Sequence, residues 1–175
     1  MAARDPLENS APLIRRVYSY VAYRIGDGPD AEDLTSEVFE RALRYRKSYD
    51  PDRGTPLAWL LGIARRCVED AFPRPRISTI GALEGASPEN VEAEAVQRLT
   101  LAAAIERLDE RARDLLALRY GADLGARQIG VVLGLKTNAV EVALHRAVSR
   151  LRTDLQEPDA RGAAPRPDPA GRTSS

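Results

Sequence analysis

The sequence predicts an all-α protein of two small helical domains joined by a flexible linker, with a helix-turn-helix in the C-terminal domain and a disordered C-terminal tail. Three observations carry this prediction. Apolar residues recur at helical spacing through two segments of roughly 70 and 65 residues. The alternation typical of a strand appears in neither segment. A stretch rich in proline and glycine, PRPRISTIGALEGASPEN, separates the two segments.

The proline-rich stretch sets the expected domain boundaries. We expect a first domain at residues 10–72, a linker at 73–87, a second domain at 88–155 and a tail at 156–175. The tail combines proline, glycine, serine and arginine without a periodic apolar pattern. It has too little apolar surface to offset the entropy of ordering it, which is typical of disorder.

The first segment predicts three helices. The first carries an apolar residue at every fourth position and stops at Gly26, a common helix end; these residues are Leu13, Val17, Val21 and Ile25. The second begins with Asp30 as its N-cap, has an acidic first turn and carries an apolar stripe from Leu34 to Tyr45. The third begins at Thr55-Pro56, because a hydroxyl cap followed by proline suits a first turn. Its expected buried face is Leu57, Leu60, Leu61, Ala64, Val68 and Ala71.

The second segment predicts four helices. Ser87-Pro88 opens one, and Asp109 caps the next, which Gly121 closes. A short helix at 126–133 then meets a turn at Gly134 and a longer helix. Helix, tight glycine turn and helix form the helix-turn-helix pattern, whose second helix can enter the DNA major groove. The pattern alone fits an ordinary helical hairpin with a solvated polar face equally well.

Composition excludes several classes of function. The single Cys67 and single His145 rule out a disulfide framework and a cysteine zinc site, so we expect no metal. No nucleophile-base-acid arrangement or phosphate loop is present, so we expect no catalytic residue, no cofactor and no enzyme. Cys67 reads as a small core residue. No apolar run approaches the roughly 18 residues of a membrane span, and no signal peptide is visible, so we expect a cytoplasmic protein without membrane contact.

Two stretches of the chain resemble the sigma-70 family of transcription initiation factors. LDERARDLLALRYGADLGARQIGVVLGLKTNAVEVALHRAVSRLR is similar to the domain that reads the −35 promoter element. DGPDAEDLTSEVFERALRYRKSYDPDRGTPLAWLLGIARRCVED resembles the domain that binds core RNA polymerase and opens the −10 element. A short linker replaces the long central domain of primary sigma factors, as in the extracytoplasmic-function (ECF) subgroup. The resemblance spans residues 13–155.

The resemblance implies core RNA polymerase and promoter DNA as partners, and promoter-specific transcription initiation as the function. It also allows an inhibitory anti-sigma factor as a partner. The helix AEDLTSEVFERAL matches the segment that docks on the polymerase. The implied polymerase-binding residues are Asp30, Glu32, Asp33, Leu34, Glu37, Val38 and Phe39. The alternative for the acidic residues is that they only complement the helix dipole.

The resemblance places −10 recognition in two neighbouring stretches. SYDPDRGT matches the pocket for a base flipped out of the non-template strand, where stacking and edge hydrogen bonds offset the cost of flipping. PLAWLLGIARR matches the surface for single-stranded and duplex −10 DNA. The implied −10 residues are Tyr49, Arg53, Trp59, Arg65 and Arg66. For Trp59 we expect packing against a neighbour ahead of stacking on DNA, and Pro-Asp-Arg-Gly can also be only a turn.

The recognition helix carries the implied −35 residues, which are Lys136, Thr137, Asn138, Glu141, Val142, His145 and Arg146. Lys136 and Arg146 lie roughly 15 Å apart along a helix, which suits two phosphate anchors flanking a base-reading patch. Glu141, Val142 and Ala143 stand where the family often has basic or hydroxylated residues, so the −35 sequence does not transfer. The net charge of zero fits a protein that binds promoters within a holoenzyme. A stand-alone helix-turn-helix regulator is the alternative, but it leaves the match of the first segment unexplained.

Overall fold

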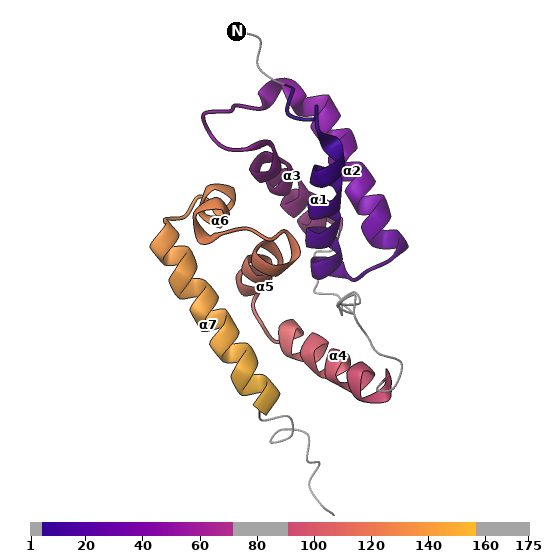
Figure 1. The fold of residues 1–175 in the computed structure, drawn as a ribbon, viewed down its shortest axis with the longest axis vertical. Coiled ribbons are helices and arrows are strands. Elements are labelled where there is room, and N and C mark those ends of the chain that lie inside the picture. The colour runs from indigo at the N-terminus through magenta and orange to yellow at the C-terminus, as the bar shows by residue number, and fades with distance from the viewer. Residues whose placement is uncertain (1–4, 72–90, 157–175) are drawn as a thin grey trace, which may run out of the picture.

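The computed structural model describes residues 5–71 and 91–156, and all regular elements among them are helical. The all-α class is therefore confirmed (Figure 1). The expected linker and nearly all of the expected tail lie outside the described residues. In chain order the elements are α1 (Ser10–Ile25), α2 (Pro29–Tyr45), the 3-10 turn η1 (Arg46–Ser48), α3 (Pro56–Ala71), α4 (Val91–Glu106), α5 (Glu110–Leu116), the π-helical turn η3 (Ala117–Gly121), α6 (Ala126–Leu133) and α7 (Thr137–Gln156).

Most helix starts follow the local sequence signals. The Thr55 hydroxyl accepts a hydrogen bond from the Ala58 amide at 3.2 Å, and the Asp109 carboxylate accepts one from the Ala112 amide at 2.8 Å, so both predicted caps are confirmed. The prediction that Asp30 caps α2 is wrong. The helix begins two residues earlier than an Asp30 cap implies, because Pro29 suits its first position, and Asp30 lies inside the first turn.

The helices α1, α2 and α3 pack on one another around a shared core. Its fully buried members include Tyr20, Val38, Leu60 and Leu61. Most of the expected apolar face of α3 is buried, but Ala71 at its end is exposed. Cys67 is fully buried, which confirms it as a small core residue.

The helices α4 to α7 form a second group, in which α7 packs on α4, α5 and α6. The α6 helix spans the predicted residues and ends at Gly134, whose φ of 67° is left-handed and favours glycine. Val140 and Ala147 of α7 are buried, and Leu155 near its end is 37% exposed. The predicted helix-turn-helix is therefore present in the structure.

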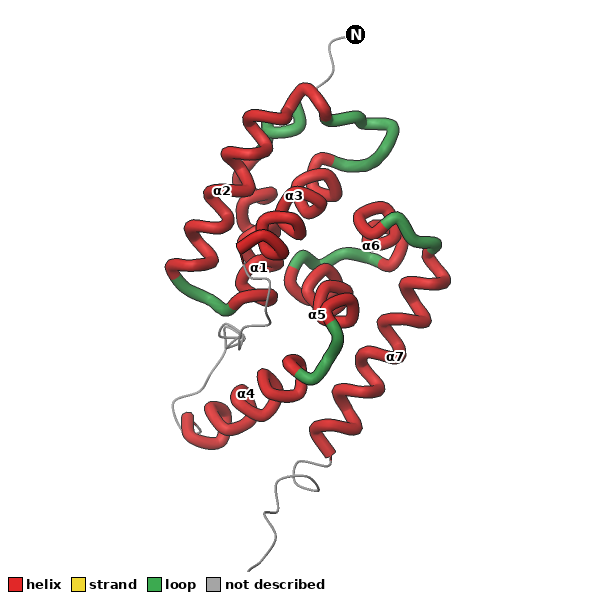
Figure 2. The backbone as a smooth tube through the Cα atoms, turned by 180° about the vertical axis from the view of Figure 1, so that it is seen from behind, coloured by secondary structure: helices red, strands yellow, loops and turns green. Residues whose placement is uncertain are grey.

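The two groups of helices lie against each other, which the sequence pattern did not predict. The π-helical turn η3 packs on α1, and α6 packs on α3 (Figures 1 and 2). One continuous apolar core contains residues of both groups, with Leu118 and Ile129 joining Val21 and Leu60. Gly121 permits the close approach, because a Cβ on it would lie 2.9 Å from the backbone oxygen of Ser19.

Candidate functional site

The outer face of α2 carries the acidic residues expected to bind polymerase. Asp30, Glu32 and Asp33 are exposed. Glu37 is half-buried and accepts a hydrogen bond from Arg41 at 2.5 Å, and Arg41 also pairs with Asp70 at 2.9 Å. Charge is therefore presented along this side of the helix.

Two of the three apolar residues expected on the same surface lie in the core instead. Leu34 is 5% exposed and Val38 is fully buried, so both pack in the core and hold α2 from inside. Phe39 is half-buried and packs against the edge of that core. Among these three side chains, only Phe39 is in a position to contact a partner directly.

Three of the expected −10 residues line one cavity, and a fourth, Tyr49, packs its ring against one of them. The Tyr49 hydroxyl donates to the Gly54 carbonyl at 3.1 Å, and the Tyr49 and Trp59 ring centroids lie 5.6 Å apart with their planes tilted by 59°. Trp59 lines a cavity of about 380 Å³ together with exposed Arg53 and Arg66. The site therefore combines an aromatic surface with two guanidinium groups, which is the chemistry that stacks bases and binds backbone phosphates.

The fifth expected −10 residue, Arg65, is engaged inside the protein. Its Nε donates to the carboxylate of Asp114 on α5, a residue that is 4% exposed. The same carboxylate accepts a hydrogen bond from the Tyr20 hydroxyl at 2.5 Å and one from Arg24 at 3.1 Å. We call Tyr20, Arg24, Arg65 and Asp114 the Asp114 cluster.

The Asp114 cluster shifts the pKa values of Arg65 and Tyr20. Burial alone would lower the pKa of Arg65, but the charge and hydrogen bond of Asp114, together with smaller contributions from Tyr20 and Glu69, hold that pKa above its ordinary value. Burial, reinforced by the charge of Asp114, raises the pKa of Tyr20 well above its ordinary value. Tyr20 therefore stays a hydroxyl donor at neutral pH.

Sequence reasoning missed Asp114, although a signal was present. A carboxylate four residues before Leu118 lies on the same face of a helix as that buried leucine. An acidic residue on an apolar face is rarely tolerated without partners. Its partners come from α1 and α3, which no local pattern identifies.

The expected −35 residues share the outer face of α7. Lys136, Asn138, Glu141, His145 and Arg146 are exposed. Thr137 at the start of α7 is half-buried, and Val142 is 49% exposed. Six of the seven residues thus lie on α7 and Lys136 lies in the turn just before it, in positions from which they can contact a groove of DNA.

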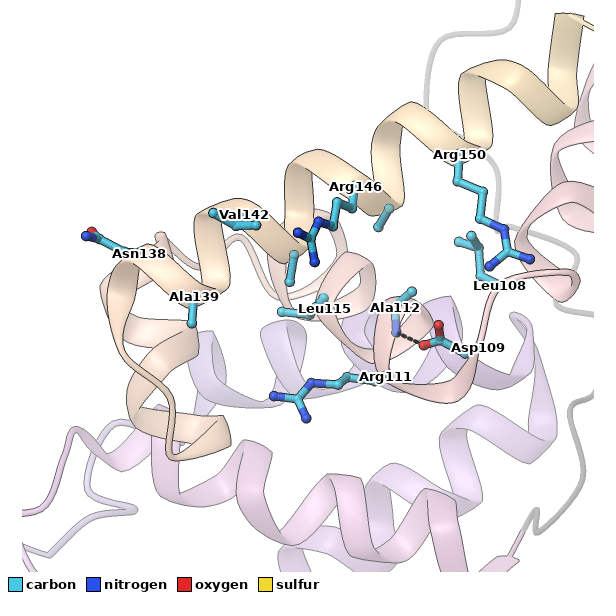
Figure 3. A pocket seen from close by; sticks show the side chains of 12 residues that line it. Leu108, Asp109, Arg111, Ala112, Leu115, Asn138, Ala139, Val142, Arg146 and Arg150 are labelled. Carbon is cyan, nitrogen blue, oxygen red and sulfur yellow. Dashed lines mark hydrogen bonds between the residues drawn. The ribbon is translucent and has the colours of Figure 1, made fainter.

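A groove between α5 and α7 adjoins this face. It has a volume of about 710 Å³ and an apolar floor that includes Leu115 and Ala147. Arg111, Arg146 and Arg150 line it (Figure 3). Within the described part of the chain, none of these three arginines pairs with a carboxylate.

The sequence pattern did not identify Arg111 and Arg150 as candidate DNA-binding residues, for different reasons. Arg111 lies on α5, outside the helix-turn-helix, so only the fold brings it beside Arg146. Arg150 follows Arg146 by four residues on the same face of α7, and that spacing was a readable signal. The three arginines give this face a local positive charge that the net charge of zero conceals.

The described residues offer neither a metal site nor a membrane span. Across 5–71 and 91–156, no group of three or more His, Cys, Asp or Glu side chains is placed to hold a metal ion. None of the helices described is long and apolar enough to cross a membrane. Burial raises the pKa of the Cys67 thiol.

Comparison with known proteins gives matches along both halves of the chain. Residues 11–76 match sigma-70 region 2, and residues 98–151 match sigma-70 region 4. The ECF RNA polymerase sigma factor BldN of Streptomyces coelicolor is 35% identical over 153 residues, covering 83% of this chain and 58% of BldN. The ECF RNA polymerase sigma factor SigD of Mycobacterium tuberculosis is 32% identical over 170 residues, covering 88% of this chain and 77% of SigD.

Two solved structures share the arrangement of helices. One is CnrH in complex with the cytosolic domain of CnrY, with a TM-score of 0.60 and 23% identity, covering 85% of this chain and 83% of CnrH. The other is the sigma factor RpoE in complex with the anti-sigma factor NepR from Bartonella quintana, with a TM-score of 0.57 and 18% identity, covering 83% of this chain and 92% of RpoE. At these identities the likeness shows the fold.

Proposed function

This chain belongs to the ECF subgroup of the sigma-70 family, and on that premise we propose that it binds core RNA polymerase and directs transcription initiation at specific promoters in the cytoplasm, with no catalytic chemistry of its own. The observation that supports this most strongly is the ordered pair of region 2 and region 4 on one chain. A stand-alone DNA-binding regulator would need only the second. The chain spans 58% of BldN and 77% of SigD, so the proposal concerns the two regions that they share with it.

The proposed polymerase contact is the acidic side of α2. Asp33 is exposed, and Arg41 pairs with the carboxylate of the half-buried Glu37. Phe39, half-buried at the edge of the core, supplies apolar surface on the same helix. Leu34 and Val38 are assigned a supporting role, because their burial fixes the helix without reaching a partner.

The proposed −10 contact is the −10 face, which we define as Tyr49, Arg53, Trp59, Arg65 and Arg66. A flipped base would stack on the aromatic pair, since stacking contributes about 1–3 kcal/mol per base. The arginines would bind the backbone of the same strand.

The proposed −35 contact is the outer face of α7 together with the groove between α5 and α7. Glu141 can accept from a cytosine amino group, and Val142 can contact a thymine methyl group. Arg111, Arg146 and Arg150 would anchor phosphates on either side.

The experiment that tests the function is transcription in vitro with purified core polymerase and a promoter library. Initiation at a defined set of promoters that depends on both the chain and core polymerase supports the proposal. A footprint on DNA that forms equally well without polymerase, and no initiation with it, would favour the stand-alone regulator instead.

The experiment that tests the docking face is co-purification with core polymerase. Asp33→Arg with Glu37→Arg should abolish association while helicity by circular dichroism is preserved. Glu106→Arg, a charge reversal on α4, is the control and should associate normally. Undiminished association of the double variant rules out the docking assignment.

A further inference from the structure

Region 4 covers part of the −10 face in this structure. The α6 helix packs on α3, which carries Trp59, Arg65 and Arg66. Val131 and Val132 of α6 form one wall of the cavity that Trp59 lines. A Cβ added to Gly54 would lie 3.0 Å from Cγ1 of Val131, so α6 also reaches the turn that precedes α3.

The Asp114 cluster engages the remaining residue of the −10 face. Carboxylate and phosphate oxygens are the same kind of acceptor for a guanidinium group. Asp114 also accepts hydrogen bonds from Tyr20 and Arg24, so it is fixed in place by donors of α1 as well as by Arg65 of α3. While Asp114 accepts from Nε of Arg65, that nitrogen is not available to DNA.

The seven expected −35 residues, which we call the −35 face, are left uncovered by the same arrangement. In both views α7 lies on the side of α5 and α6 that faces away from α1 to α3 (Figures 1 and 2). Asn138, Glu141 and His145 are exposed on it. The contact between the two regions therefore affects one promoter-reading surface and spares the other.

Resting on the function proposed above, we propose that the free chain is closed on itself, with region 4 as an intramolecular competitor of the melted −10 strand: Asp114 takes the place of a DNA phosphate on Arg65, α6 covers the base pocket beside Trp59, and the −35 face stays open. Melted DNA gains access when α5 and α6 leave α3. If the open form is a minor state of about 0.1–10%, closure weakens the apparent affinity for the −10 strand by ten-fold or more.

Two substitutions open the chain by unrelated routes, and neither alters a residue of the −10 face or the −35 face. Asp114→Asn removes the charge that holds Arg65 and Arg24 while keeping the shape of the side chain. Gly121→Ala places a methyl group against the backbone of α1 and changes no charge. Gly125→Ala is the matched control, because its Cβ would meet only the Gln128 side chain at an ordinary 3.7 Å.

The first measurement is acrylamide quenching of Trp59, the single tryptophan of the chain. Opening removes the cavity wall that Val131 and Val132 form and exposes Trp59 to the quencher. Quenching should therefore rise in Asp114→Asn and Gly121→Ala and stay at the wild-type level in Gly125→Ala. Circular dichroism confirms that each variant is folded. Unchanged quenching in both folded opening variants overturns the proposal.

The second measurement is binding of the full-length chain to two DNA pools. One is single-stranded and randomised at the −10 positions, and the other is duplex and randomised at the −35 positions. Both opening variants should bind the single-stranded pool at least about ten-fold more tightly than the wild type, with duplex binding unchanged. Equal binding of the single-stranded pool by all proteins, including equally weak binding, overturns the proposal.

Transcription with core polymerase separates this inference from the function on which it rests. If none of the proteins supports initiation, the proposed function fails. If all support initiation while their binding of the single-stranded pool is equal, the function stands and the closed form fails.

Discussion

Replacing Gly121 by alanine should push the two regions apart. The added Cβ would lie 2.9 Å from the Ser19 oxygen, 3.1 Å from the Tyr23 Cβ and 3.2 Å from the Tyr20 Cα. Two of these atoms belong to the backbone of α1, which cannot rotate away as the end of a side chain does. Overpacking of this kind costs about 1–3 kcal/mol.

A second glycine separates this steric cost from the helix propensity of alanine. A Cβ on Gly62, in the middle of α3, would meet nothing within 4 Å. Gly62→Ala should therefore gain up to about 1 kcal/mol from propensity alone. The difference between the two variants isolates the steric cost, so Gly121→Ala should be about 1–3 kcal/mol less stable than Gly62→Ala.

Urea denaturation followed by circular dichroism measures this difference in the free energy of unfolding. For a chain of this size, each kcal/mol also corresponds to roughly 2–4 °C in Tm. Equal stability of Gly121→Ala and Gly62→Ala would show that α1 and η3 do not approach as closely in solution as the structure has them, and the argument from close contact would fail.

Three further perturbations address other parts of the molecule. Leu60→Ala empties a fully buried core position and should lower the free energy of unfolding by about 2–5 kcal/mol in urea denaturation; a loss under 1 kcal/mol would contradict that packing. The pKa of Tyr20 is raised by folding, so its stabilisation is intact below about pH 10 and declines above it; Tyr20→Phe should flatten the alkaline decline of the unfolding free energy, and an identical decline in both proteins would refute this. In a selection from a randomised −35 library, Arg146→Ala should weaken all sequences about equally, whereas Glu141→Ala should shift one base preference by about 1–3 kcal/mol; an unchanged preference for Glu141→Ala removes it from base reading.

Local signals predicted the helices well because helix boundaries depend on a few neighbouring residues. The predicted limits of α6 agree with the structure, since Gly134 can adopt the left-handed conformation that ends a helix. The caps at Thr55 and Asp109 depend on contacts three residues away. The start of α2 was misplaced where two local signals competed, and the preference of Pro29 for the first position prevailed over Asp30 as a cap.

The surfaces were predictable only where one element supplies all their residues. Six of the seven expected −35 residues lie on α7 and Lys136 directly precedes it, so helical periodicity is enough to bring them together. An amphipathic pattern does not say which apolar residues face the core and which face a partner, so Leu34 and Val38 were assigned to a surface that they do not reach. Arg65 and Asp114 are 49 positions apart, and their pairing depends on the packing of α3 against region 4.

Charge placement also reconciles a net charge of zero with the proposed binding of DNA. Exposed acids gather along α2, while Arg111, Arg146 and Arg150, which pair with no carboxylate among the described residues, line the groove between α5 and α7. The Debye length at physiological salt is about 8 Å, so charges on α2 do not cancel the field at a groove on the far side of the core. If the same 26 acidic and 26 basic residues were spread evenly, neither surface would carry a net charge. This separation of charge, which composition cannot reveal, gives region 2 the acidic face that we propose binds polymerase and region 4 the basic face that we propose binds promoter DNA.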